Sequence, residues 1–561
     1  MLKNRHEGSE AVLPTREKPA IGIMPNIAWS LRRRLARLDA FDLASGLLIA
    51  GLVIIALMTF RDYGISNDEE VQHRYGELII AYYSSGFSDQ TLFHFKNLYL
   101  YGGLFDIIAV LLTRLLPFDL FLIRHLLSAA IGIGGIAATA ATARLIAGPR
   151  AGFIAAAALA ICGPWFGGMF NHTKDVPFAA AMMAAIYFLL RATRELPRPR
   201  WGDILGFGLT LGAALGLRAT ALLLFGYAVI AIVLGISWRP SGFAQGARFF
   251  LQSIVRFIPA FVVGYAIMIA AWPWASLDPF NPLRAIFSFA HFHYQIRTII
   301  AGKMYDMADV PWWYVPGYLL IKLPIFIFVG ALCALVFAAF SAAGAGHGAR
   351  RGRETAFVAL TILFPLCCEM IAEGPAFDGL RHFMFVVPPL AVLCGIGFDA
   401  LLVSLSGRRR WLGLAGHAAL AAVMVWNASV LVRLHPYESL FYNQFVGGLE
   451  GAARRYVMDY WLNMLPEAVR DLADYLDRTE PNAGASRTFT VGICGERFAF
   501  ETYADKRMKW SRWWLEADFY ISPTHMNCDG VIDGKVIATI ERMGVAIGVV
   551  KDHRGSKQAG L

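Results

Sequence analysis

Hydrophobic residues recur along the chain in runs of about twenty, separated by short polar and basic connections. A run of that length crosses the hydrocarbon core of a bilayer as one α-helix. The pattern therefore predicts an α-helical polytopic membrane protein with about eleven transmembrane helices. The predicted spans are residues 42–60, 120–146, 151–169, 177–193, 203–217, 219–237, 249–271, 314–340, 355–372, 383–404 and 411–433.

Basic residues gather in alternate connections between these spans, as in Arg350-Arg351 and Arg408-Arg409-Arg410. Because cytoplasmic loops carry an excess of Lys and Arg, these connections and the basic N-terminal arm (residues 1–41) are predicted to be cytoplasmic. The other connections, and everything after about residue 434, are then extracytoplasmic. The sequence thus divides into the N-terminal arm, a transmembrane domain over 42–433 and a C-terminal domain over 434–561.

The composition supports a membrane protein, since 57% of the 561 residues are hydrophobic and only 16% are charged. Soluble proteins carry closer to a quarter charged residues. The net charge of +10 could indicate nucleic-acid binding. However, the basic residues lie in short clusters between apolar runs, which is the distribution that membrane orientation produces.

The first outer loop, residues 61–119, is predicted to hold two segments that lie at the membrane surface. Apolar positions recur at helical spacing over 70–83 with charges opposite, which is typical of an amphipathic interfacial helix. Residues 99–116 are apolar but contain Asp106 and two glycines, and a crossing there would break the charge parity. We therefore interpret them as a re-entrant or interfacial segment.

The C-terminal domain is predicted to be a small α/β domain outside the membrane. Helical patterning covers 463–478, and strand-like runs follow at 488–493, 518–521, 536–540 and 545–550. Cys494 and Cys528 flank one of these strands in a compartment that would be oxidising. A disulfide between them is therefore one of two open alternatives, the other being two free thiols.

The acidic run Asp68-Glu69-Glu70 follows the first span directly. An amphipathic helix often begins in this way, with Asn67 or Asp68 as the N-cap. A cap does not require three consecutive acids, however. The alternative is that a carboxylate at the outer face serves as a general base.

A second group of charged residues fills the short loop between the third and fourth spans, where His172, Lys174 and Asp175 are held near one point. Asp175 could simply cap the fourth span, with Pro177 in its first turn. A cation beside an acid at a membrane surface would also suit binding of a phosphate next to a reacting hydroxyl.

Several further cations lie at the outer ends of segments, where each is either a snorkelling anchor or an anion-binding group. These residues are Lys96, Arg218, Arg381 and His382. Lys322 lies deeper, roughly 14 Å along its span at helical rise. A lysine at that depth needs an anionic partner or a water-filled cavity.

Short segments over residues 42–461 resemble the GT-C glycosyltransferases, in particular the protein O-mannosyltransferase and aminoarabinose (lipid A) transferase branch and its bacterial family 39-like members. They agree in order and in membrane side. They are Asp68-Glu69 with Tyr75-Gly76-Glu77 behind it, and residues 93–97, 174–177, 212–220, 312–324, 378–383, 435–437, 442–443 and 459–461.

The resemblance implies a GT-C fold and an inverting transfer of a sugar from a polyprenyl-phosphate donor to an acceptor hydroxyl at the outer face of the bacterial inner membrane. It implies that Asp68 is the catalytic base, with Glu69 or Asp175 positioning the acceptor or supporting Asp68. It also implies candidates for binding the donor phosphate. These are Lys96, Lys174, Arg218 and Arg381, to which we add His382 and Lys322.

The acceptor implied by the resemblance is a lipid, a glycan or a protein, and membrane lipids surround the enzyme. The resemblance leaves a divalent metal ion open, because some GT-C enzymes with diphosphate-linked donors need one. The alternative function is a multi-span transporter or flippase for a lipid-linked sugar. It would predict ionisable residues at mid-membrane and two related halves, whereas the acids here collect at the outer face.

Overall fold

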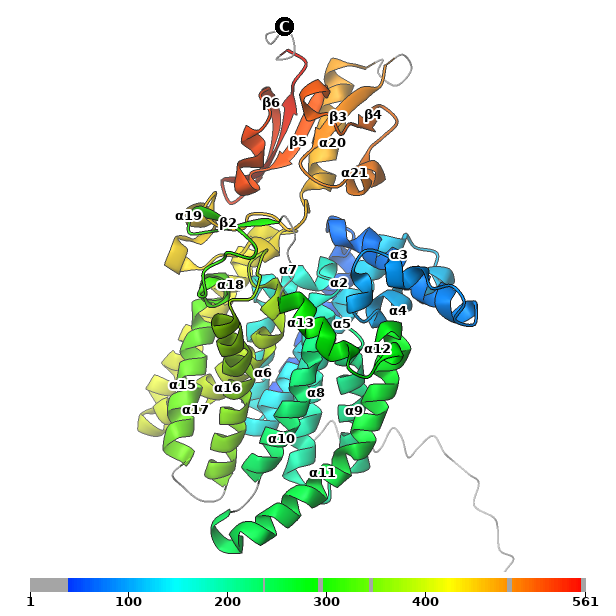
Figure 1. The fold of residues 1–561 in the computed structure, drawn as a ribbon. Coiled ribbons are helices and arrows are strands. Elements are labelled where there is room, and N and C mark those ends of the chain that lie inside the picture. Colours follow the sequence, from blue (N-terminus) through cyan, green and yellow to red (C-terminus); the bar gives the residue numbers. More distant parts are fainter. Residues whose placement is uncertain (1–38, 236–237, 291–295, 343–346, 482–486, 556–561) are drawn as a thin grey trace, which may run out of the picture.

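The computed structural model describes residues 39–235, 238–290, 296–342, 347–481 and 487–555. The predicted cytoplasmic arm lies outside the described residues up to residue 38. A bundle of helices forms the larger part of the molecule, and a sheet region stands on its upper end (Figure 1).

Seven helices of the described chain are long and apolar enough to cross a membrane. They are α2 (Ala40–Thr59), α5 (Leu120–Ala147), α8 (Asp175–Arg194), Gly242–Ala271 of α11 (Trp238–Ala271), Gly348–Ala372 of α16 (His347–Ala372), Arg381–Arg408, which joins η4 (Arg381–Val386) to α17 (Val387–Arg408), and α18 (Arg410–Leu434).

The remaining predicted spans are bent or short. Two helix pairs pass the same test only together: α6 (Pro149–Ala160) with α7 (Gly163–Asn171), bent by 65°, and α14 (Tyr314–Lys322) with α15 (Ile325–Ala342), bent by 107°. Pro164 and Pro324 lie at these breaks, where a residue without an N–H can begin a helix but not continue one. The predicted spans 151–169 and 314–340 are therefore not single straight helices.

Two shorter apolar helices, α9 (Trp201–Leu215) and η3 (Ala219–Leu222) with α10 (Leu223–Gly235), complete the bundle. Within the described residues, which leave out 236–237 of the span predicted at 219–237, every predicted span falls on apolar helix, and the polytopic helical fold is confirmed. The number of eleven crossings stays a prediction.

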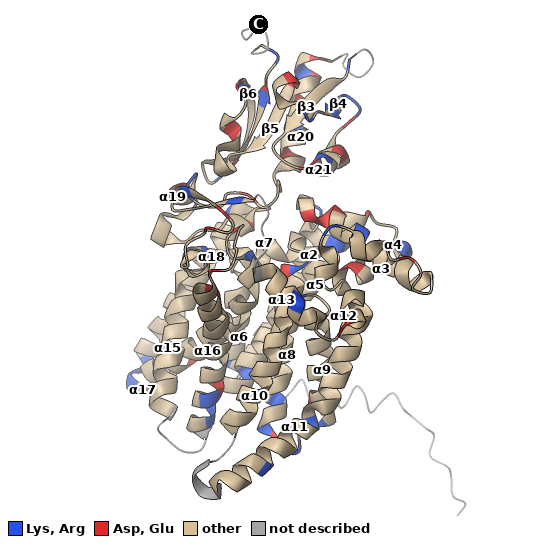
Figure 2. Cartoon of the chain, in the orientation of Figure 1, with Lys and Arg blue, Asp and Glu red and all other residues tan. Residues whose placement is uncertain are grey.

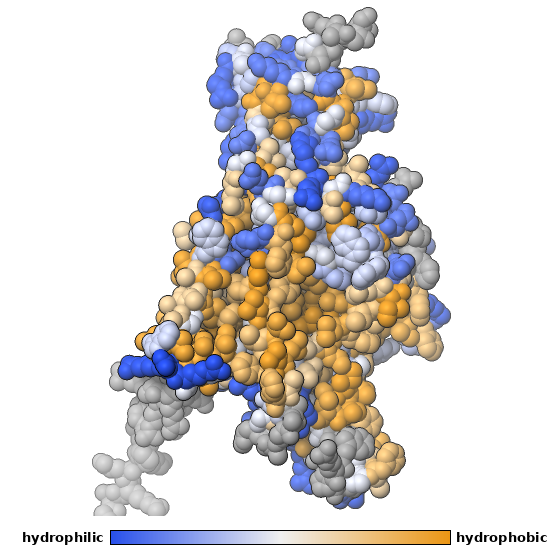
Figure 3. All heavy atoms as spheres, turned by 90° about the vertical axis from the view of Figure 1, so that its left-hand side faces the viewer, coloured by the Kyte–Doolittle hydropathy of each residue, from blue (hydrophilic) through white to orange (hydrophobic). Residues whose placement is uncertain are grey.

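The bundle is built around α17 and α8, of which 83% and 67% of the apolar windows are buried, against 11% for α2 and α18 at the rim. Small residues allow the close packing of α17. A Cβ on Gly395 would lie 2.3 Å from the Ala151 carbonyl oxygen of α6, and one on Gly397 only 1.8 Å from the Gly330 carbonyl oxygen of α15. Apolar residues cover most of the side of the bundle on the face shown in Figure 3, and we call this region the apolar belt.

Charged residues lie at the two ends of the bundle rather than in the belt (Figure 2). Lys and Arg are frequent at the lower end, where Arg150 pairs with Asp399 of α17 at 2.8 Å. The lower end therefore carries basic clusters from which the cytoplasmic side was predicted, and that orientation stays a prediction.

The first loop folds over the upper end as α3 (Asn67–Ser84), η1 (Thr91–His94), η2 (Leu98–Leu100) and α4 (Leu104–Leu115). With 12 residues, α4 is too short to span a bilayer, as predicted for residues 99–116. Ser66 caps α3 in a capping box with Glu69. The expectation that Asn67 or Asp68 is the cap was therefore wrong, and the Asp68 carboxylate is left for other contacts.

The loop before α14 carries α12 (Pro273–Leu277), α13 (Asn281–Ala290) and a hairpin of β1 (Arg297–Ile300) and β2 (Lys303–Asp306). After α18 the chain continues through η5 (Glu438–Leu440), η6 (Gln444–Val446) and α19 (Gly448–Ala452). It then enters α20 (Leu465–Thr479).

The C-terminal sheet has the order β4-β3-β5-β7-β6. β3 (Phe489–Ile493) is parallel to β4 (Met508–Trp510) and β5 (Phe519–Pro523), whereas β7 (Val545–Asp552) is antiparallel to β5 and β6 (Lys535–Arg542). The helix and four strands predicted here are present, whereas the three-residue strand β4 and the short helix α21 (Arg497–Tyr503) were missed. Short helices η7 (Trp514–Glu516), η8 (His525–Gly530) and α21 (Arg497–Tyr503) connect the strands.

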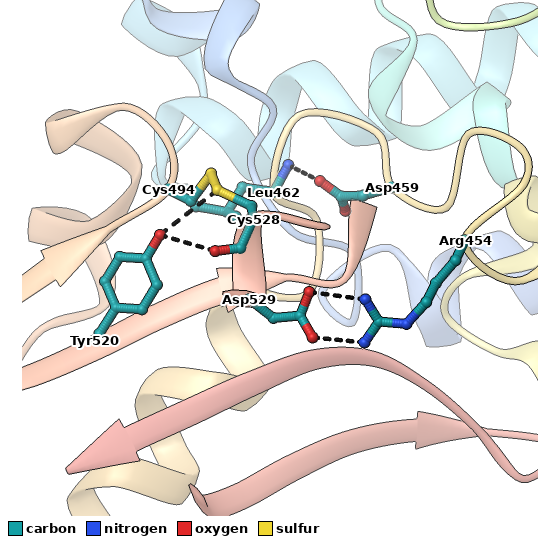
Figure 4. The surroundings of a disulfide bond; sticks show 7 residues. All are labelled: Arg454, Asp459, Leu462, Cys494, Tyr520, Cys528 and Asp529. Atoms are coloured by element: carbon teal, nitrogen blue, oxygen red, sulfur yellow. Dashed lines mark hydrogen bonds and ion pairs between the residues drawn. A yellow bond between two sulfur atoms is a disulfide. The ribbon is translucent and has the colours of Figure 1, made fainter. Parts of the chain in front are cut away.

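Cys494 and Cys528 form a disulfide that links the end of β3 to η8 (Figure 4). Of the two alternatives that the sequence left open, the structure therefore has the disulfide.

Candidate active site

A cavity of about 1470 Å³ opens at the upper end of the bundle. Its wall comes from α3, the loop before α8, the turn from α9 to η3 and α10, the upper end of α16, η4, and the chain after α18. Seven of the nine predicted site residues line it. These are Asp68, Lys96, Lys174, Asp175, Arg218, Arg381 and His382.

Asp68 lies in the first turn of α3 with 40% of its side chain exposed. Its Oδ2 lies 3.4 Å from Arg381 Nη2, and it is not part of the capping box. The carboxylate therefore faces the cavity, is accessible to a second molecule and has a cation beside it.

Arg381 begins η4 and is surrounded by anionic and aromatic groups. Its Nη1 donates to the Tyr460 hydroxyl at 3.3 Å and lies 3.4 Å from Asp378 Oδ2. The Phe377 and Trp461 rings lie under the guanidinium at 4.9 and 5.8 Å. Burial raises the pKa of Asp378 to about 6, although Arg381 acts in the opposite direction. Arg381 is thus held rigidly, as an anion-binding group must be.

Asp175 is the first residue of α8 and forms a close ion pair with Arg218. The expectation that Asp175 caps this helix was wrong, because the N-cap is Lys174 and no side chain caps the helix. Asp175 is 4% exposed. Its carboxylate instead connects α8 to Arg218, the residue before η3.

Lys174 reaches into the cavity with its Nζ 3.9 Å from the centre of the Tyr101 ring. Burial lowers the pKa of Lys174 to about 8, and the negative charge of Asp68 opposes this shift. Lys174 is therefore a cation whose charge is sensitive to pH near neutrality. Lys96 is exposed and lies at the rim of the same cavity.

Glu69 does not line the cavity and is fully buried beneath α3. Its Oε1 accepts the backbone N–H of Ser66 at 2.9 Å and lies 3.2 Å from His125 Nε2. Next to it, Arg124 Nη2 donates to three acceptors on three different segments. They are Asp106 Oδ1, Gln72 Oε1 and Thr173 Oγ1, at 2.8, 3.1 and 3.2 Å. Glu69 thus belongs to a buried network that fixes α3 to α4, α5 and the loop before α8.

Lys322 also lies outside the cavity wall. Its Nζ donates to the Ser439 carbonyl oxygen at 2.8 Å and lies 3.9 Å from the centre of the Tyr442 ring. The sequence predicted an anionic partner or a water-filled cavity for Lys322, and the structure has a carbonyl oxygen and an aromatic face instead.

Other residues of the site received no individual role from the sequence. Tyr460 stacks on His172 with ring centres 3.7 Å apart, and burial lowers the pKa of His172 to about 4. The neutral imidazole therefore brings no charge to the site. Asn171 lines the cavity, and its buried Oδ1 accepts no hydrogen bond from the described residues. Tyr460 and Asp378 lie within segments singled out by the resemblance.

No group of three or more His, Cys, Asp and Glu side chains within the described ranges is arranged to hold a metal ion. Acids and cations lie next to one another in the cavity, as for Asp175 with Arg218 and for Asp68 with Arg381. Such pairs can bind an anion while keeping a carboxylate close to it.

Comparison with known families finds one match, to the model of the dolichyl-phosphate-mannose-protein mannosyltransferases, over residues 104–274. This stretch contains Lys174, Asp175 and Arg218. The match confirms the resemblance to the protein O-mannosyltransferase branch of the GT-C glycosyltransferases, and indicates a membrane glycosyltransferase. No curated protein sequence matches the chain.

Solved structures with a similar course of the chain include ArnT from Cupriavidus metallidurans bound to undecaprenyl phosphate. It is 14% identical, has a TM-score of 0.48, and the alignment covers 90% of this chain and 97% of ArnT. The oligosaccharyltransferase of Archaeoglobus fulgidus in its apo form is 12% identical. Its TM-score is 0.46, and the alignment covers 83% of this chain and 64% of that protein.

Proposed function

We propose that this protein transfers a sugar from a polyprenyl-phosphate donor to an acceptor hydroxyl at the outer face of the inner membrane, with inversion and with Asp68 as general base. The observation that carries the proposal is the cavity itself. It brings a partly exposed carboxylate, four Lys and Arg side chains and a mostly apolar stretch of wall together in one space.

One part of the cavity wall suits the lipid of such a donor. It is formed by the end of η3, by α10 and by the upper part of α16, and its side chains are mostly apolar. They include Leu222, Leu223, Tyr227, Ile230, Phe364 and Pro365. Because α16 is long and apolar enough to cross a membrane and α10 packs against it, a prenyl chain could reach this wall from the bilayer and bury its surface there.

The charged end of the cavity suits the phosphate. Lys174, Arg218 and Arg381 can surround an anion from three elements, and Arg381 offers the planar fork that matches phosphate oxygens. A phosphate that leaves from the sugar gains negative charge in the transition state. Cations that are already in place stabilise it without needing to protonate it.

Asp68 suits the acceptor side of the reaction. In the proposed step the acceptor O–H proton passes to the Asp68 carboxylate while the acceptor oxygen bonds to the anomeric carbon. The bond between that carbon and the phosphate oxygen breaks, and its electron pair leaves with the polyprenyl phosphate. Asn171 supports a sugar between these ends, since its buried amide oxygen can accept a hydroxyl hydrogen bond.

The test is sugar transfer in membranes supplied with a polyprenyl-phosphate-linked radiolabelled sugar. Asp68→Asn should lower the rate by about 10²–10⁴-fold, the usual contribution of a general base, at unchanged expression. Asp89→Asn, in the segment after α3 and outside the cavity wall, is the matched control and should stay close to wild type. Near-full activity of Asp68→Asn would exclude Asp68 as the base. Release of intact donor on the opposite side of the membrane, with no new glycoside, would instead identify a flippase.

A further inference from the structure

The cavity is not built by the membrane bundle alone. Tyr460, Trp461 and Glu496 line it, and all three follow α18 in the chain. These residues belong to a part of the wall other than α10 and α16, along which the donor lipid would enter.

Glu496 lies on the loop between β3 and α21, where it is the residue before the helix. Two residues earlier, Cys494 is linked to Cys528 (Figure 4). A Cβ on Gly495 would lie 2.6 Å from Leu462 Cδ2, so this loop packs closely against the segment that carries Trp461. The disulfide and this packing hold Glu496 in place although its side chain is exposed.

The same region is docked onto the start of α3. The Tyr503 hydroxyl of α21 accepts the backbone N–H of Ile65 at 3.0 Å, three residues before Asp68. The Phe498 and Phe121 rings lie 5.3 Å apart, and a Cβ on Gly64 would lie 2.3 Å from the Asn463 carbonyl oxygen. Glu496 and Asp68 are therefore parts of one packed unit and line the same cavity.

Glu496 and Asn67 differ in chemistry from the cations proposed to bind the phosphate. Glu496 has no ion pair within 4.0 Å among the described residues, and Asn67 Oδ1 is buried with no hydrogen-bond partner there. Both are acceptors, and the Trp461 ring, 5.8 Å from the Arg381 guanidinium, lines the same cavity. Carboxylate and amide oxygens bind hydroxyl groups, while an aromatic face covers the apolar side of a sugar ring.

We propose that Glu496, Asn67 and Trp461 form an acceptor subsite for a sugar, so that the acceptor hydroxyl belongs to a glycan or glycolipid rather than to a protein side chain. The inference rests on the proposed function for its place in the reaction. Glu496 takes no proton in the transfer. It accepts hydrogen bonds from acceptor hydroxyls and thereby brings one hydroxyl to Asp68.

The test uses the full-length protein in lipid nanodiscs and the dodecyl glycosides of glucose, galactose and mannose, with dodecanol as the matched alcohol without a sugar. Binding is measured by saturation-transfer NMR and needs no donor. We expect the wild type to bind at least one glycoside. Glu496→Gln should weaken that binding roughly tenfold or more, the usual effect of losing a hydrogen bond to a charged group. Glu501→Gln, on the same helix but paired with Arg497 at 2.8 Å, should leave it unchanged.

The transfer assay supplies the second measurement. Glu496→Gln should raise KM for the glycoside by the same factor while KM for the donor and the rate with dodecanol stay unchanged. Glycoside binding that is absent from the wild type, or that is equal in the wild type and Glu496→Gln, would overturn the inference. So would preferential transfer to a serine-containing peptide. If binding depends on Glu496 but no sugar is transferred, the subsite stands and the proposed function fails.

Discussion

Arg381 and Asp68 are separated by 313 residues in the sequence, yet Arg381 Nη2 lies 3.4 Å from Asp68 Oδ2. The contact is long for a hydrogen bond between charged groups, which is usually 2.7–2.9 Å. Asp68 therefore lies close to a cation without forming a short ion pair with it. A phosphate that bound Arg381 would come within a few ångströms of the same carboxylate, which is the arrangement that a direct transfer from phosphate to hydroxyl requires.

Arg381→Lys keeps the charge but loses the fork of donors, and should therefore raise KM for the donor roughly tenfold. Arg381→Ala should lower kcat/KM by about 10²–10³-fold, because a fixed donor aimed at developing charge is lost. Both are measured by donor titration in the transfer assay. Arg433→Lys is the control, since that exposed residue at the upper end of α18 does not line the cavity. A donor KM that is unchanged in Arg381→Lys would contradict the role.

Variants of the Asp175–Arg218 pair should affect stability and activity in different ways. Asp175→Asn leaves the Arg218 charge unpaired in a mostly buried site, which costs about 3–5 kcal/mol when a buried pair is broken. Adding Arg218→Gln removes that charge and should recover much of the melting temperature. Activity should not recover, because the phosphate end then lacks a cation. A double variant as active as Asp175→Asn would show that Arg218 does not act on the donor.

Much of the fold could be predicted from the sequence, because apolar runs and alternate basic loops report directly on the membrane. The bends at Pro164 and Pro324 were missed, since each divides an apolar run without shortening it. Hydropathy reports the length of an apolar run but not where the helix changes direction within it.

The site was predictable where charge at a loop indicates function, as for Asp68 and Asp175. It was not predictable where partners lie far apart in the sequence. Arg124 and His125 were read as part of an apolar span, and only the folded chain places them beneath Glu69. No sequence pattern marked Glu496 as a site residue, because its place in the cavity depends on how the C-terminal sheet docks onto the bundle.

Glu69→Gln tests the buried network beneath α3. A glutamine can still complete the capping box, but it loses the charge facing His125 and Arg124, which lies 4.0 Å away. Weakening a buried charged acceptor should lower the free energy of unfolding by about 1–3 kcal/mol. Thermal unfolding in detergent measures it. Glu70→Gln, exposed on the same turn, should change stability by no more than about 0.5 kcal/mol. Equal melting temperatures for the two variants would contradict a structural role for Glu69.

The Cys494–Cys528 disulfide closes a loop with a sequence separation of 34 residues. Such a loop should stabilise the C-terminal region by about 3–4 kcal/mol through the entropy of the unfolded chain. A variant with both cysteines replaced by serine should therefore show earlier proteolysis of this region, while the helical bundle keeps its melting temperature. Glycoside binding should also weaken, because Glu496 is two residues from Cys494. The variant Cys333→Ser, in α15, is the control. Wild-type protease resistance in the double variant would contradict the prediction.

Lys174 predicts the alkaline limit of activity. Burial lowers its pKa to about 8, so the charged form is present below that pH and is lost as the pH rises through it. Since kcat/KM reports on the free enzyme, it should fall roughly tenfold or more across this range as one phosphate-binding charge disappears. Lys174→Arg stays charged, so its decline in kcat/KM should move to higher pH. The kcat/KM of Lys174→Met should be low at every pH. Lys303→Met, exposed on the β1–β2 hairpin, should keep the wild-type profile. An unshifted decline in Lys174→Arg would mean that another group sets the limit.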